Sequence, residues 1–143
     1  MKLLSRRRRA RRLEKELGRG LWRQAHDRFV RGLDRYHQIL EGVDDDAAHN
    51  ELVRLGDELA EALPSLRACC VAAQRRWPAE EMRIPGGAAR LHSELSRAAN
   101  HLATTAEAAA MVRLGSAEIA AVRRRADRVL ECVEQARALA DEG

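Results

Sequence analysis

Residues 52–77, "LVRLGDELAEALPSLRACCVAAQRRW", decide the fold, because their apolar side chains recur at the repeat of an α-helix. The stripe consists of Leu52, Leu55, Leu59, Leu63, Leu66, Cys70, Ala73 and Trp77. Its mean spacing of about 3.6 residues is one helical turn. Pro64 lies inside this pattern, lacks a backbone donor and clashes with the preceding turn. The stretch therefore predicts a long helix over residues 45–77, kinked or broken near residues 60–64.

A second apolar stripe precedes this one and predicts a helix over residues 5–41. Its members are Ala10, Leu13, Leu17, Leu21, Ala25, Phe29, Leu33, Tyr36 and Leu40. Gly18, Gly20 and Gly32 each weaken such a helix by up to about 1 kcal/mol relative to Ala, so either packing holds it straight or it bends at these positions. Gly42 predicts its end, and Asp44–Asp46 predict the N-cap of the next helix.

Two further helical seams follow the connection 78–87, which contains Pro78, Pro85, Gly86 and Gly87. The first seam consists of Leu91, Leu95, Ala98, Leu102, Thr105, Ala109 and Val112, and the second of Ile119, Val122, Ala126, Val129, Val133, Ala136 and Ala140. Gly115-Ser116 between them is typical of a helix end followed by an N-cap. The alternative is one helix over 88–142, about 80 Å long, which a compact chain cannot cover. We therefore expect two helices joined by a turn.

Four long segments with short connections favour an all-α protein, an antiparallel up-down four-helix bundle whose second helix is kinked near Pro64. A chain of 143 residues has the usual length of one domain. We assign residues 13–143 to this single bundle domain. Residues 1–12 are expected to form a basic arm, a helical extension or a disordered segment, that overhangs the bundle.

The positive charge of the chain is concentrated in that arm. Residues 1–12 carry seven basic side chains and no acidic one, whereas the whole chain has a formal net charge of +4. Residues 13–143 therefore carry 4 − 7 = −3. Arginine and alanine are abundant throughout the chain, which is typical of a biased composition. The choice of arginine over lysine in the arm is therefore no evidence for specific phosphate recognition, and only the charge of the arm is considered.

Candidate metal, redox and catalytic residues are few. Asp34-x-x-His37 and Asp46-x-x-His49 flank one turn, but Asp is shorter than the Glu of helical metal motifs, and Asp46 is suited to capping. The adjacent Cys69 and Cys70, and Cys132, lie on or beside the apolar stripes and are interpreted as small buried hydrophobic residues. Their odd number without regular spacing indicates no disulfide framework. No nucleophile–base arrangement stands out. We predict no metal, no cofactor and no enzymatic activity.

The arm is therefore the candidate binding element, and its basic residues are Lys2, Arg6, Arg7, Arg8, Arg9, Arg11 and Arg12. We expect a cytoplasmic interaction or scaffolding bundle whose arm docks on an anionic surface or an acidic protein partner, peripheral to membrane or nucleoid. One alternative is a DNA- or nucleoid-associated accessory protein that contacts phosphates. A further alternative is a bundle that binds a small ligand or metal. A homodimer is a further alternative, because the small residues of the seam over 119–140 would allow close packing against a second copy of the chain.

Overall fold

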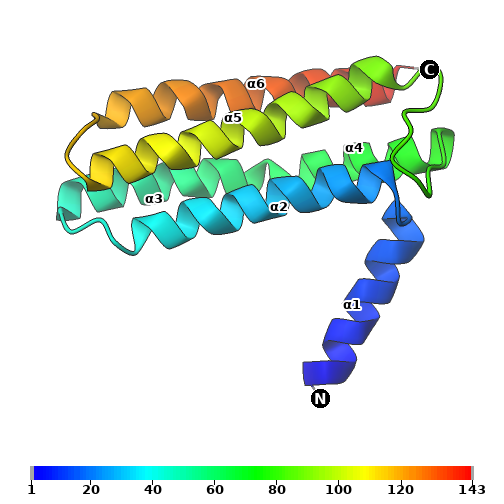
Figure 1. Cartoon of the computed structure of the whole chain (residues 1–143), viewed down its shortest axis with the longest axis horizontal. Coiled ribbons are helices and arrows are strands. Elements are labelled where there is room, and N and C mark those ends of the chain that lie inside the picture. The colour runs from blue at the N-terminus through cyan, green and yellow to red at the C-terminus, as the bar shows by residue number, and fades with distance from the viewer. Residues whose placement is uncertain (1, 143) are drawn as a thin grey trace.

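The computed structural model describes residues 2–142, and this part of the chain is all-helical, without a β-strand. Its six helices are α1 (Lys2–Leu17), α2 (Leu21–Leu40), α3 (Asp46–Glu61), α4 (Leu63–Arg76), α5 (Ala89–Arg113) and α6 (Ile119–Asp141). Helices α2 to α6 lie lengthwise beside one another, and α1 projects away from them (Figure 1). The protein is thus an elongated helical body of five helices with one protruding helix.

The number of helices differs from the prediction because both N-terminal segments are interrupted. The single helix expected over residues 5–41 is wrong: it is α1 and α2, separated by residues 18–20. The interruption expected near residues 60–64 is confirmed, since α3 ends at Glu61 and α4 begins at Leu63. Pro64 lies in the first turn of α4, where backbone N–H groups have no acceptor within the helix, so the missing N–H of proline costs no hydrogen bond.

The turns agree with the local sequence signals except at one cap. Asp45 caps α3 by accepting a hydrogen bond of 2.8 Å from the backbone N–H of Ala48. The chain leaves α5 at Gly115, and the N–H of Ser116 donates to the carbonyl of Met111 at 2.8 Å. A turn therefore joins α5 and α6, and one long helix over 88–142 is wrong. The N-cap of α6 is Glu118 and not Ser116, and its side chain makes no capping hydrogen bond.

One continuous core lies between α2 and the helices that surround it. Trp22, Phe29 and Tyr36 of α2 are completely buried, and α2 packs mainly against α5, whose buried residues include several alanines. The hydroxyl of Tyr36 donates to the carbonyl of Leu52 at 2.6 Å, which joins α2 to α3. The indole N–H of Trp22 donates to the carbonyl of Trp77 at 2.9 Å, which joins α2 to the end of α4. Within residues 2–142, no helix combines the length and the apolar character that a membrane span requires.

Candidate anion-binding arm

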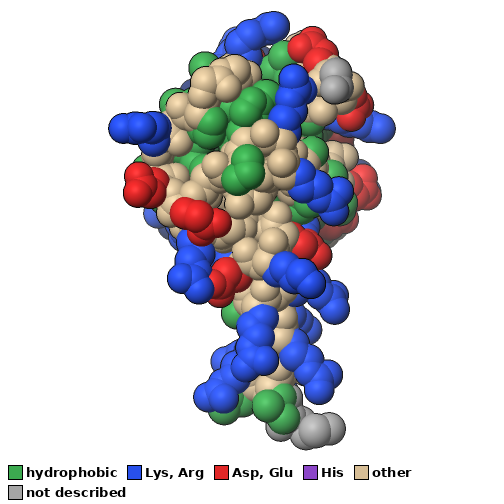
Figure 2. Space-filling view, turned by 90° about the vertical axis from the view of Figure 1, so that its right-hand side faces the viewer, with side chains coloured by type: hydrophobic (Ala, Val, Ile, Leu, Met, Phe, Trp, Pro, Cys, Tyr) green, Lys and Arg blue, Asp and Glu red, His purple; other side chains and the backbone are tan. Residues whose placement is uncertain are grey.

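The first eleven described residues of α1 expose every side chain. Residues 2–12 are all solvent-exposed, and none of them belongs to the core. Figure 2 views the body along its length and the protruding helix from the side, and it shows Lys and Arg side chains on both sides of that helix. The seven basic residues predicted to bind an anionic partner are therefore brought together on one helix, outside the body.

The root of α1 is anchored by two leucines. Leu17 is completely buried, and Leu13 is partly buried against the core, so the apolar stripe of the helix enters the body only over its last two turns. α1 contacts α4 and α2 there. The remaining turns, which hold the basic cluster, have no packing partner in the described part of the chain.

A tight elbow between α1 and α2 sets the direction of the arm. Gly18 adopts a positive φ of 73°, which a residue with a side chain rarely adopts. A Cβ atom at Gly20 would lie 2.5 Å from the backbone of Glu81, so the 78–87 connection rests directly on the elbow. The N–H of Leu21 also donates to the carbonyl of Glu81 at 3.0 Å. These contacts hold the arm at a defined angle to the body.

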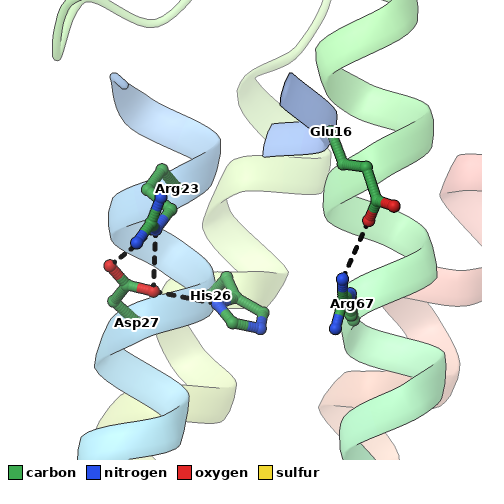
Figure 3. Close-up of polar contacts among 5 residues, drawn as sticks. All are labelled: Glu16, Arg23, His26, Asp27 and Arg67. Atoms are coloured by element: carbon green, nitrogen blue, oxygen red, sulfur yellow. Dashed lines mark hydrogen bonds and ion pairs between the residues drawn. The ribbon is translucent and has the colours of Figure 1, made fainter. Parts of the chain in front are cut away.

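The two acidic residues of α1 are already paired, and the basic residues of the arm are not. Glu14 pairs with Arg19 at the elbow, and Glu16 pairs with Arg67 of α4 at 2.9 Å (Figure 3). The hydrogen bond from Arg67 is the main cause that lowers the pKa of Glu16 below its usual value. None of the seven basic residues in residues 2–12 lies within 4.0 Å of a carboxylate in residues 2–142. The arm therefore carries positive charge that no described part of the chain neutralises.

A groove of about 730 Å³ lies where the arm meets α4. It is lined by Arg11, Arg12, Lys15, Glu16, Val71, Gln74, Arg75 and Pro78. Four of these side chains are basic, and the one carboxylate is the Glu16 that Arg67 already neutralises. Sequence reasoning missed Lys15 and Arg75 as parts of this surface, because they are sixty positions apart and only the packing of α1 against α4 brings them together.

The other polar candidates form no comparable surface. His37 Nδ1 lies 2.8 Å from the carbonyl of Leu33, and nothing places Asp34 with it in a metal site. Among the described residues, no three His, Cys, Asp or Glu side chains are arranged to hold a metal ion. The half-buried Asp27 lies 2.9 Å from Nδ1 of the buried His26 and 2.9 Å from Nε of Arg23 (Figure 3). These contacts join three residues of α2 within five positions of one another.

The cysteines are buried and protonated at neutral pH. Burial raises the pKa of Cys69 to about 11, and it also raises the pKa values of Cys70 and Cys132. All three thiols are free. A thiol with a raised pKa is a poor nucleophile and a poor metal ligand, because the thiolate is the reactive species. This agrees with their interpretation as core residues.

Comparison of the chain with known protein families, with curated proteins and with solved structures finds no match.

Proposed function

We propose that the protein is a non-enzymatic interaction or scaffolding module of the cytoplasm, which uses α1 to dock on an anionic surface or acidic partner. In this interpretation the body is an antiparallel up-down four-helix bundle in which α3 and α4 together form one of the four rods. The observation that carries the proposal is the set of seven exposed, unpaired basic side chains on a helix that leaves the body.

The internal repulsion of the arm supports this role. Lys2 and Arg6, Arg7 and Arg11, and Arg8 and Arg12 are pairs four residues apart, and like charges at this spacing destabilise a helix by a few tenths of a kcal/mol each. Positive charge near a helix N-terminus also opposes the helix dipole. A bound polyanion relieves both effects, so α1 gains stability when it binds.

The anchored root supports the role as well. Because Leu17 is buried and the elbow rests on the 78–87 connection, the arm extends away from a body whose net charge is negative. The basic side chains are thereby presented to a partner and not to the acidic residues of their own chain. This arrangement suits electrostatic docking, and binding to any polyanion can therefore serve as a first test of it.

The direct test is retention on immobilised heparin, measured as the salt concentration at which the protein elutes. The arm variant carries Arg6→Gln, Arg7→Gln, Arg8→Gln and Arg9→Gln, because Gln keeps the helix propensity and removes the charge. The matched control removes four exposed, unpaired arginines elsewhere, with Arg31, Arg124, Arg125 and Arg128 replaced by Gln.

Both variants lower the net charge by four, so a difference between them reports position and not total charge. We expect the control to elute near the unmodified chain and the arm variant to elute at much lower salt. Equal elution of the two variants, or failure of the unmodified chain to bind, would contradict the proposal.

A further inference from the structure

We propose that the partner of the arm is B-form duplex DNA, and that α1 lies in its major groove with phosphates of both walls in reach. This inference rests on the proposed function and assigns the anionic partner a chemical class. It is carried by the distribution of charge around α1, the dimensions of the arm, the basic groove at its root and the burial of the aromatic side chains.

The charges surround the helix. Successive residues of an α-helix are about 100° apart around its axis. At this step, the seven basic residues leave a single uncharged sector of about 100°, between Arg6 and Arg7, which Leu3 and Ala10 occupy. All of these side chains are exposed. A flat anionic surface contacts one side of a helix, whereas a groove with phosphates on both walls contacts opposite sides at once.

The dimensions of the arm fit the major groove. An α-helix with its side chains is about 10–12 Å in diameter, and the major groove of B-form DNA is about 12 Å wide. Residues 2–12 extend for about 16 Å at about 1.5 Å per residue. This length covers about five base pairs, whose two strands carry enough phosphates for all seven basic side chains.

The groove at the root extends this surface beyond the arm. A phosphate backbone that leaves the arm toward the body meets Lys15 and Arg75 across the groove between α1 and α4. Glu16 in the same groove does not repel it strongly, because Arg67 neutralises its charge at 2.9 Å. Basic side chains therefore extend from the tip of α1 to Arg75 near the end of α4.

The aromatic side chains oppose a single-stranded partner. Binding of unpaired bases relies on exposed aromatic rings for stacking. Trp22, Phe29 and Tyr36 are completely buried, and Trp77 is partly buried with Arg76 stacked on its ring at 4.4 Å. These are the only aromatic residues of the chain. Duplex RNA fits less well than duplex DNA, because its major groove is deep and narrow.

A membrane surface fits less well than DNA. Leu3 and Leu4 are exposed near the tip of α1, with 62% and 57% of their surfaces accessible. Leu3 lies in the uncharged sector with Ala10 and near the line of Leu17, but Leu4 points about 100° away, between Arg8 and Arg11, so the apolar face of the arm is limited to that one narrow sector. A helix that lies on a bilayer needs a broad apolar face opposite its charged one.

The test compares four probes by fluorescence anisotropy or sedimentation. They are a duplex DNA of about 20 base pairs, long enough for the arm and its root groove, the same sequence as single-stranded DNA and as duplex RNA, and vesicles of phosphatidylserine and phosphatidylcholine. We expect the duplex DNA to bind most tightly. Its affinity should fall at least about a thousandfold between 50 and 200 mM salt, as seven phosphate contacts require.

The two variants described above locate the contact. With four contacts removed, the slope of log K against log salt becomes shallower by about 3.6 in the arm variant and stays unchanged in the control. Duplex DNA with glucosylated hydroxymethylcytosine, which fills the major groove, should bind more weakly, and distamycin, which occupies the minor groove, should not displace the protein. In addition, hydrogen exchange of the amides of residues 2–12 should slow on DNA and not on vesicles.

The possible failures are distinct. Retention on heparin together with preference for vesicles, single strands or duplex RNA would overturn the DNA inference and leave the proposed function in place. Displacement by distamycin without an effect of glucosylation would overturn the placement in the major groove. Absence of binding to heparin, to every nucleic acid and to vesicles would overturn the inference and the proposed function together.

Discussion

Removal of residues 1–12 tests whether the arm is separate from the folding of the body. Among the described residues 2–12, a chain that begins at Leu13 loses only exposed side chains, and these make no ion pair with the rest of the described chain. Leu13 and Leu17, which contact the core, are retained. The deletion also removes the repulsion between basic residues one turn apart. We therefore expect the free energy of unfolding to change by no more than about 0.5 kcal/mol.

The comparison variant is Leu17→Ala, which perturbs the same helix inside the core. Leu17 is completely buried, and truncation of a buried leucine to alanine costs about 2–5 kcal/mol. For a domain of this size, that loss lowers Tm by at least about 4 °C, whereas the deletion shifts Tm by about 2 °C or less. Urea unfolding followed by circular dichroism measures both values. A deletion that costs as much as Leu17→Ala would refute the separation of arm and body.

Three further substitutions test local contacts. Gly20→Ala places a methyl group 2.5 Å from the backbone of the 78–87 connection and should cost about 1–3 kcal/mol, whereas Gly86→Ala, with open space around it, should be nearly neutral in the same urea titration. Tyr36→Phe leaves a buried carbonyl without its 2.6 Å hydrogen bond and should cost about 1 kcal/mol by denaturation. Burial lowers the pKa of His92 below its unfolded value of 6.5, so the unfolded chain takes up the proton more readily and stability falls as the pH drops below about 6.5. In His92→Gln this fall in the free energy of unfolding, measured between about pH 7.5 and 5, should be smaller.

Each of these expectations has a result that contradicts it. Equal losses in the two glycine variants would show that the connection does not rest on the elbow. An unchanged free energy of unfolding in Tyr36→Phe would show that water or another donor replaces the hydroxyl. Identical pH dependence in His92→Gln would assign the acid sensitivity to other groups, of which His101, also lowered in pKa by burial, is the first to examine.

The features that could be predicted from sequence depend on chemistry within one or two helical turns. The period of the apolar stripe predicted the helices, Pro64 predicted the interruption between α3 and α4, and Asp45 lies among the predicted cap residues of α3. Each signal is local, because a missing donor or a capping carboxylate acts on its own turn. Most of the helices and their approximate ends could therefore be predicted from the sequence.

The break between α1 and α2 could not be predicted from local signals alone. Leu13, Leu17 and Leu21 continue the apolar stripe across Gly18 and Gly20, so the pattern alone favoured one helix over residues 5–41. What breaks the helix is the 78–87 connection, which lies against Gly20 and accepts the hydrogen bond of Leu21. Gly18 and Gly20 marked where a bend was possible, but the contact that makes it a break lies about sixty residues away in sequence. For the same reason, the convergence of Lys15 and Arg75 could not be foreseen.

The elbow also explains how the arm and the body coexist in one chain. The arm carries seven positive charges and residues 13–143 carry a net charge of −3, so an arm on a flexible linker would be attracted to its own body. Molecules with the arm folded back would be unable to bind a partner, and the apparent affinity would fall in proportion to their fraction. The contacts of Gly20, Leu21 and Leu17 oppose that state by holding α1 away from the body. If the arm binds as proposed, the elbow contributes to binding without touching the partner, because it keeps the charge of the arm available.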